Sequence, residues 1–266
     1  MLFMRPFFFA ATVAVSLFLA VAPCAAQKKI KDGEGTYKYP DGKVYTGQWK
    51  GGVPHGEGSI TMPNGESYTG MMQDGKKNGH GVYLYEGGDK YDGEWVNDMK
   101  NGDGVFTWST GDRYEGHFTN GEMDGFGTYT AEAGYSYSGD WKEGVWEGHG
   151  IFIRSDGEKY DGEWVADMRC GKGTLTDADG KLLYEGEWKD GEKNGFGEGH
   201  SIDGSVYTGQ WVANRKEGQG VQIYYNGKKY DGQWRADKPD GEGTMYDADG
   251  NVIHSGRWSE GEFVGE

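Results

Sequence analysis

Several residue types that hold ordinary protein cores together are scarce in this sequence. The 266 residues include 2 Cys and 6 Pro, and 35% of them are hydrophobic. So few cysteines exclude a small scaffold that is stapled by several disulfides. The few prolines, without a glycine at every third position, exclude a collagen-like chain. Scarce Leu, Ile and Val also argue against a helical bundle with a thick apolar core.

Glycine and aromatic residues are abundant instead. The chain has 50 Gly, 18 Tyr, 11 Phe and 10 Trp, and glycine averages only about 7% of ordinary proteins. Disordered segments are poor in aromatic residues, so this composition argues against simple disorder. We therefore expect a β-rich array in which glycines and aromatic rings occupy fixed positions.

The first 26 residues differ from the rest of the chain. One basic residue, Arg5, precedes an apolar run from Phe7 to Val21, and small residues follow up to Ala26. These three parts are typical of a secretory signal peptide. The run is shorter than the ~20 residues that a membrane-spanning helix needs. We expect cleavage after Ala26 and a secreted or periplasmic protein, with lipid anchoring at Cys24 as the alternative.

The mature chain is strongly acidic. Removal of residues 1–26 leaves 26 basic and 43 acidic side chains, a net charge of −17. Such a surface repels nucleic acids and anionic membranes at long range. We therefore expect no nucleic-acid partner and at most weak contact with a membrane surface. A single cysteine, Cys170, remains, so we expect no internal disulfide.

A short motif recurs along almost the whole mature chain. Tyr-x-Gly-x-Trp begins at residues 45, 91, 137, 160, 184, 207 and 230, with variant copies at 68, 114 and 254. The step between copies is 23 residues, with two steps of 24. Seven residues after each Trp position comes Gly-x-Gly, as in Gly56-Glu57-Gly58. Such self-similarity predicts a repeat architecture.

Tyr-x-Gly-x-Trp followed by Gly-x-Gly in a 23-residue unit resembles the MORN (membrane occupation and recognition nexus) repeat. The resemblance covers about residues 32–266 and implies an elongated row with one β-hairpin per unit. We divide the chain into a signal peptide (1–26), a linker with a partial repeat (27–44) and an array of about ten units, the last one truncated (45–266). The resemblance also implies a scaffold, with membrane association as a candidate role.

The motif itself predicts the same fold. Tyr, Gly and Trp alternate with polar residues, which is the pattern of a strand with one apolar face. Turns that contain Asp-Gly or Asn-Gly, as at Asn64-Gly65, are strong hairpin signals. We expect an all-β fold, an elongated single-layer twisted antiparallel sheet of successive hairpins, in which Tyr and Trp rings cover the strand glycines. No unit should fold alone, because each depends on its neighbours.

Two units lack the apolar residue that follows Gly-x-Gly elsewhere in the array. The position holds Gly199 in one unit and Gln222 in the next. We expect a thinner and more flexible apolar face around residues 195–222, where a ligand pocket could form.

No arrangement of residues indicates catalysis. The six histidines occupy different repeat positions without a recurring partner, and His80 and His149, each between glycines, are expected in solvent on the polar face. Gly-x-Gly belongs to hairpins here and not to a strand-to-helix phosphate loop. Residues 177–180 and 247–250 resemble only half of a calcium loop. We expect no catalytic, cofactor or metal site.

Charged residues supply the candidate contact sites. An acidic ladder on the polar face is a candidate docking stripe for a basic partner or for loosely held divalent cations, with a plain solvated face as the alternative. Its residues are Asp92, Glu94, Glu115, Asp140, Asp161, Glu163, Glu185 and Glu187. Basic doublets are the candidate contacts with lipid phosphates, through Lys76, Lys77, Arg215, Lys216, Lys228 and Lys229.

The ends of the array are candidate self-association sites. The last unit begins at His254 and is expected to have a first strand but no second, which would leave Trp258 on an open edge. Residues 33–37 form the other edge. We expect a homodimer through the sheet ends, with a monomer whose edge charges keep it solvated as the alternative.

Together these features predict an exported, non-catalytic scaffold that mediates protein–protein interactions. The alternatives are peripheral binding of membrane phospholipid, and binding of a glycan or cell-wall polymer on the aromatic face.

Overall fold

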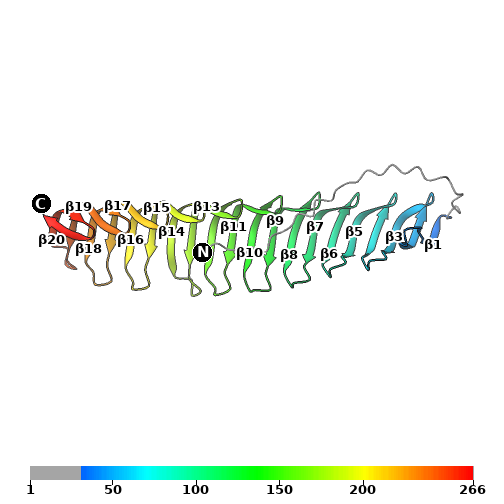
Figure 1. Ribbon diagram of the computed structural model, residues 1–266, viewed down its shortest axis with the longest axis horizontal. Helices are drawn as coiled ribbons and strands as arrows, with labels where there is room; N and C mark the ends of the chain where they lie inside the picture. The colour runs from blue at the N-terminus through cyan, green and yellow to red at the C-terminus, as the bar shows by residue number, and fades with distance from the viewer. Residues whose placement is uncertain (1–30, 266) are drawn as a thin grey trace.

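The computed structural model describes residues 31–265, which form one elongated sheet of 21 strands (Figure 1). Each strand pairs antiparallel with the strands that precede and follow it in the sequence, from β1 and β2 to β20 and β21. This is the expected single-layer row of hairpins. The predicted signal peptide and the alternative anchor at Cys24 lie outside the described residues.

Strands of two kinds alternate along the row. The even-numbered strands carry Tyr-x-Gly-x-Trp or its variants: β2 (Val44–Lys50), β4 (Ser67–Gln73), β6 (Lys90–Val96), β8 (Arg113–Thr119), β10 (Ser136–Lys142), β12 (Lys159–Val165), β14 (Leu182–Lys189), β16 (Val206–Val212), β18 (Lys229–Arg235) and β20 (Val252–Ser259).

The odd-numbered strands from β3 to β19 have nine residues each and carry Gly-x-Gly. The odd strands are β1 (Gly33–Lys38), β3 (Val53–Thr61), β5 (Lys76–Leu84), β7 (Met99–Thr107), β9 (Glu122–Thr130), β11 (Val145–Ile153), β13 (Met168–Thr176), β15 (Glu192–His200), β17 (Arg215–Ile223), β19 (Lys238–Tyr246) and β21 (Glu262–Gly265). β1 pairs fully with β2, so the array already begins at Gly33.

Two kinds of turn join the strands. Even strands lead into odd ones through tight turns with two residues at positive φ, as at Asn97 (50°) and Asp98 (71°), the geometry that two-residue hairpins favour. Odd strands lead into even ones through wider turns, in which the amide of Gly65 donates to the carbonyl oxygen of Met62 over 3.0 Å. The wider turns are those that the Asp-Gly and Asn-Gly pairs predict, and Gly65 has the positive φ that such turns require, 91°.

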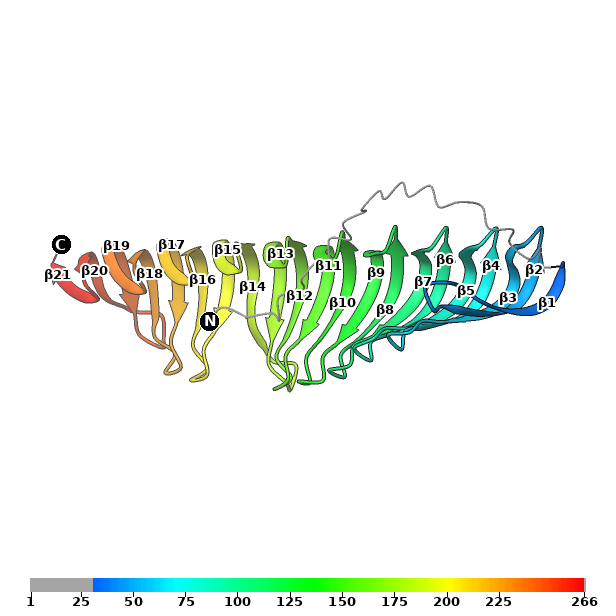
Figure 2. The same ribbon diagram turned by 45° about the vertical axis from the view of Figure 1, so that its right-hand side comes forward.

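The first glycine of Gly-x-Gly bends the strand. In β5, Lys77 pairs with Met72 and Gly81 with Gly70, so residues 78–80 lie opposite the single residue 71. Gly79 within this bulge has a φ of 80°. Bulges bend a strand and increase its twist, and the strands curve visibly along the row (Figure 2). The bend folds the tight-turn end of each hairpin over the aromatic face.

The second glycine lies under a tyrosine ring. Gly81 pairs with Gly70 on one side and with Gly93 on the other, so the glycines form a continuous row across the sheet. A Cβ atom on Gly81 would overlap the ring of Tyr68, and Tyr68 has no exposed surface. The expectation that aromatic rings cover the strand glycines is therefore confirmed.

Tyrosine and tryptophan also hold the backbone through hydrogen bonds. The hydroxyl of Tyr91 donates to the carbonyl oxygen of Glu94 over 3.0 Å, and the indole nitrogen of Trp95 donates to that of Gly81 over 3.0 Å. Glu94 pairs with His80 of β5 but lies opposite the bulge of β7, outside the register of that pair, so the phenol supplies a donor to its carbonyl. Because Gly81 belongs to the preceding unit, each tryptophan bond joins two units.

The apolar face near residues 195–222 is filled and not thinner as expected, whereas a groove lined in part by Phe196, Glu198 and Thr208 lies on the outer face of the same stretch. The indole of Trp211 fills the space over Gly199, since a Cβ atom there would lie 2.7 Å from the ring. Gln222 is 2% exposed, and its amide nitrogen donates to the carbonyl oxygens of Val206 and Ile223 over 3.2 and 3.1 Å. A neighbouring ring and a satisfied amide thus replace the missing apolar side chains and leave no gap.

The expected open edge at Trp258 is also wrong. A tight turn with positive φ at Glu260 and Gly261 reverses the chain, and β21 pairs with β20. The Phe263 ring then lies 5.5 Å from the Trp258 ring, which is 5% exposed. The four residues Glu262–Gly265 are enough to form β21, so the last unit does have a second strand.

Candidate binding surfaces

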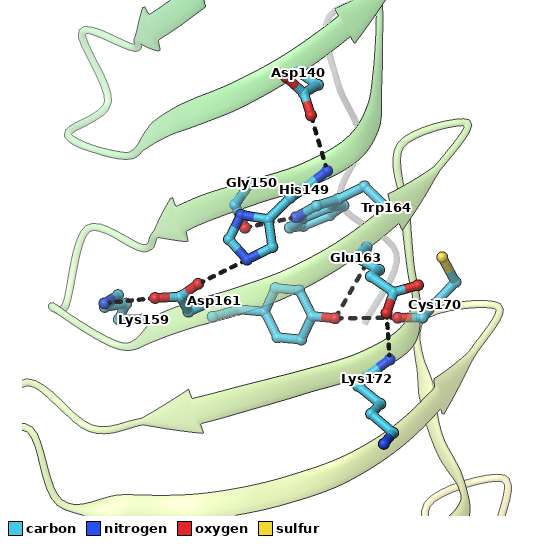
Figure 3. Close-up of polar contacts among 10 residues, drawn as sticks. Asp140, His149, Gly150, Lys159, Asp161, Glu163, Trp164, Cys170 and Lys172 are labelled. Carbon is cyan, nitrogen blue, oxygen red and sulfur yellow. Dashed lines mark hydrogen bonds and ion pairs between the residues drawn. The ribbon is translucent and has the colours of Figure 1, made fainter. Parts of the chain in front are cut away.

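The outer face of the sheet carries the eight acidic residues of the predicted stripe, but many of them are engaged within the protein. Asp161 lies 3.2 Å from the Nε2 atom of His149 and 3.0 Å from the Nζ atom of Lys159 (Figure 3). Asp92 contacts His80 and Lys90 in the same way, at 3.3 and 3.0 Å. Each cluster is half-exposed, so these contacts are surface ion pairs of modest energy.

The Asp–His contact that recurs in these two clusters corrects one expectation about histidine. His80 and His149 lie on the polar face in solvent, as predicted, with side chains 62% and 65% exposed. They do have a recurring partner, however, because the aspartate on the following strand pairs with each of them. The two clusters are 69 residues apart, three repeat lengths of 23, so the matching geometry follows from the repeat.

The remaining acidic residues have mixed surroundings. Glu115 pairs with Arg113 at 2.6 Å. Asp140 and Glu163 accept backbone N–H bonds from His149 (3.2 Å) and Lys172 (3.3 Å) on the next strand (Figure 3). Glu94 is half-exposed, and Glu185 and Glu187 are exposed. The stripe therefore exists as a row on one face, with five of its eight carboxylates exposed, and two of these, Glu185 and Glu187, both lie on β14.

A shallow groove surrounds those carboxylates. It has a volume of about 880 Å³ and runs over β11 to β16. Glu185 lies directly opposite Glu198 in the ladder, and like charges in that position repel each other. The ring of Phe196, 58% exposed, lines the same groove. Negative charge beside an exposed ring suits a cationic side chain, because a cation is attracted by both.

The inner face carries a feature that the sequence interpretation missed. In five units a basic side chain two residues before Gly-x-Gly folds over the aromatic rings, and we call this set the inner cation row: Lys77, Lys100, Arg169, Lys193 and Lys216. Lys77 Nζ lies 4.0 Å from the centre of the Trp95 ring, and the Arg169 guanidinium carbon lies 4.3 Å from that of Trp188. A cation above an aromatic ring is attracted by its π-electrons.

Alternation along the strand could have revealed the inner cation row. Lys77, Gly79, Gly81 and Tyr83 are all two residues apart, so they share a face of β5. The equivalent position holds Met123 in one unit and Trp146 in the next. Trp146 stacks on Tyr137 with ring centres 4.3 Å apart. In these seven units, one position therefore covers the tyrosine and tryptophan rings with either a cation or an apolar group.

Burial lowers the pKa values of these amines. Desolvation is the main cause at Lys100, where the nearby charge of Lys77 adds to it, and together they lower the pKa from 10.5 to about 8. Burial also lowers the pKa of Lys77 and of Lys193, and at Lys193 the charge of Arg169 acts in the same direction. Among the described residues no ion pair is made by the Lys77, Lys100 or Lys193 ammonium.

The predicted lipid contacts are split between the two faces. Lys76 and Arg215 are exposed, whereas their neighbours Lys77 and Lys216 lie over the inner aromatic rings, because adjacent residues of a strand point to opposite sides. Lys228 is exposed in the turn before β18, and Lys229 lies over the Tyr246 ring on the outer face, since the next residue, Tyr230, is buried on the inner face. The doublets therefore do not form one flat basic patch.

Three structural observations bear on metal ions, on membranes and on the predicted half of a calcium loop at residues 177–180. Within residues 31–265, no group of three or more His, Cys, Asp or Glu side chains is arranged to hold a metal ion. The same part of the chain contains no helix with the length and apolar character that a membrane crossing requires. The Asp177 carboxylate accepts amide hydrogen bonds from Asp179 and Lys181, so it closes its own turn.

Ten copies of the MORN repeat model match the chain, at residues 28–44, 45–67, 68–90, 91–113, 114–134, 137–159, 160–181, 184–206, 207–229 and 230–252. The chain therefore belongs to the MORN repeat family. A search of curated proteins found no match.

Several solved structures are similar to the fold at low identity. The TCP10 domain of Danio rerio CPAP (E1021V mutant) is 15% identical, with a TM-score of 0.42, over 84% of this chain and 99% of that one. The Drosophila melanogaster SAS-4 TCP domain, solved with a proline-rich motif of Ana2, is 15% identical with a TM-score of 0.26 over 80% and 94%. Virginiamycin B lyase from Staphylococcus aureus is 11% identical with a TM-score of 0.15 over 83% of each chain.

Proposed function

We propose that the mature chain is an exported, non-catalytic scaffold that binds proteins along the faces of its hairpin array. The observation that carries this proposal is the single-layer architecture, in which all 21 strands of the described residues belong to one open sheet. Repeat arrays of this kind offer long binding surfaces whose length scales with the number of units. Export rests on the composition of residues 1–26.

The groove over β11 to β16 is the first surface that we assign to a partner. Glu185 and Glu187 are exposed, and Glu185 faces Glu198 across the ladder. A basic segment of a partner would relieve this repulsion and contact Phe196. The net charge of −17 on the mature chain favours the approach of a basic protein at long range.

The test is affinity purification of the mature chain, residues 27–266, from the envelope fraction of its own cells after mild cross-linking. We expect a protein partner at a constant ratio to the bait. The E185Q/E187Q double variant should lose a partner that docks in the groove, whereas E122Q/E262Q, which removes two exposed carboxylates outside the groove lining, should retain it. Recovery of no protein above a mock purification would contradict the scaffold proposal.

A further inference from the structure

The inner cation row lies along aromatic rings on the inner face, and we call the stretch of this face beside Lys77 and Lys100 the trough. Beside Lys77 and Lys100, ring follows ring along the array: Tyr83 and Tyr85 are 4.5 Å apart, Tyr85 and Phe106 5.7 Å, and Phe106 and Trp108 4.7 Å. Tyr85, Phe106 and Trp108 are half-buried, so part of each ring faces solvent.

The ammonium groups at this place lack the partners that cations usually have. Lys100 Nζ lies 4.6 Å from the Phe106 ring centre and 5.1 Å from that of Phe118. Within the described residues, neither Lys77 nor Lys100 forms an ion pair. The charge of Lys77 disfavours that of Lys100, while Asp98 and Glu66 favour the charge of Lys77 without pairing with its ammonium. A partly desolvated cation without an acceptor is unfavourable. An anionic group placed between the two amines would remove this cost.

We propose that the trough over β5 to β8 binds an extended acidic segment of a partner protein, with its carboxylates on Lys77 and Lys100 and its apolar side chains on Tyr85, Phe106 and Trp108. Charge complementarity identifies the partner, because a cationic trough is unexpected in a chain with a net charge of −16. The inference rests on the proposed scaffold function and adds a second surface, opposite in charge to the groove on the outer face.

The repeat spacing sets the pattern of the acidic segment. Equivalent positions in adjacent units are two strands apart, about 9.6 Å at ~4.8 Å per strand. An extended chain rises about 3.1 to 3.4 Å per residue. Three residues therefore span one unit, and the segment should carry Asp or Glu at every third residue. A segment that runs along the array, across the strands, meets Lys77 and Lys100 in turn.

The shape of the site favours a polypeptide over a membrane surface. The bent tight-turn ends place the amines over the rings inside the trough, and the exposed neighbour Lys76 lies on the other face of β5. Lys77 and Lys100 are half-buried over the rings, so a flat layer of lipid headgroups would reach the two amines less readily than a narrow chain would. A single extended chain can enter the trough.

Fluorescence anisotropy of a labelled 15-residue peptide tests the inference directly. The probe has Glu at every third residue and Pro or Ala elsewhere, and its control has the same composition with the Glu residues contiguous. The K77M/K100M double variant should bind the probe at least tenfold more weakly than the mature chain. Met123 occupies the same position in another unit, so this variant is expected to fold, and near-ultraviolet circular dichroism checks that.

The matched control is K76M/K142M, which removes two exposed lysines from outside the trough. We expect this control to bind the probe within twofold of the unmodified chain, and the contiguous peptide to bind more weakly than the spaced one. Equal losses in both double variants, or no binding of the spaced peptide at millimolar concentration, would overturn the inference. Binding of inorganic polyphosphate without binding of the peptide would overturn the choice of a protein segment.

The two proposals fail in different ways. If K77M/K100M still bound the probe like the unmodified chain while the envelope purification recovered a partner, the trough assignment would be wrong and the scaffold function would stand. If the purification recovered no protein with any variant, the scaffold function itself would fail.

Discussion

The indole nitrogen of Trp164 donates a hydrogen bond to the carbonyl oxygen of Gly150 over 3.0 Å, which joins β12 to the preceding unit (Figure 3). Equivalent bonds are made by Trp49, Trp95, Trp141, Trp188, Trp211, Trp234 and Trp258. Cohesion between units therefore depends on a polar contact as well as on ring packing.

The W164F variant separates these two contributions. It removes the hydrogen bond but keeps a ring, as Phe118 does naturally at the equivalent position of β8. We expect a loss of about 1 kcal/mol in the free energy of unfolding, because a typical hydrogen bond contributes that much. W164A should cost about 3 to 5 kcal/mol, since it also removes the buried ring. Urea denaturation measures both, and a W164F variant as stable as the unmodified chain would show that the bond contributes nothing.

The glycine row predicts a sharp contrast between two Gly→Ala changes. A Cβ atom at Gly173 would overlap the Tyr160 ring, whereas one at Gly87 would meet nothing within 4 Å. We expect G173A to lower the free energy of unfolding by roughly 3 kcal/mol or more through overpacking. G87A should be close to neutral. Thermal melts of both variants check this, and similar melting temperatures would refute the role assigned to the second glycine.

Lys100 should reduce the stability of the array. Its pKa is lowered to about 8, so the unfolded chain binds more protons than the native one between pH 8 and about 10.5, and stability from this group rises with pH in that window. K100M should raise the free energy of unfolding at pH 7 by on the order of 2 kcal/mol, less than the full shift implies because solvent screens this half-buried amine. The gain should shrink from pH 7 to 9.5, as followed by urea denaturation. A variant that is less stable at pH 7 would contradict this account.

The tyrosines should limit stability in alkali. Burial raises the pKa of Tyr184 and of Tyr230 from 10.0 to about 12. Unfolded phenols therefore lose their protons first, and stability falls as the pH rises above 10. Each such group contributes a slope of about 1.4 kcal/mol per pH unit. We expect cooperative unfolding between pH 10 and 12 by circular dichroism, and an array that stayed folded at pH 12 would contradict it.

Much of the fold follows from the sequence, because the alternation within a strand and the residue pairs of the turns are both local signals. Alternation places Tyr160, Gly162 and Trp164 on one face, and pairs such as Asn64-Gly65 specify turns. The bulge at the first glycine is different, since its bend depends on the pairing of two strands. The sequence does not show that bend. It therefore indicates that Lys77 belongs to a basic doublet, but not that its amine lies over the Trp95 ring.

The functional surfaces were harder to predict for the same reason. The acidic stripe follows from alternation, but the neutralisation of Asp92 and Asp161 depends on which strand lies next to each. The end of the array was misjudged because the pattern alone does not show that Glu260 and Gly261 form a tight turn, which brings Phe263 onto Trp258.

Deletion of one complete unit, residues 137–159, tests most directly the claim that the protein is a linear array whose units contact only their neighbours. Small-angle scattering and urea denaturation of the mature chain and of the deletion variant give the result. We predict a folded, shorter particle with unchanged thickness, because Tyr160 would take the place of Tyr137 against β9. A collapse to an unfolded profile would contradict the account, since it would reveal a core that extends beyond neighbouring units.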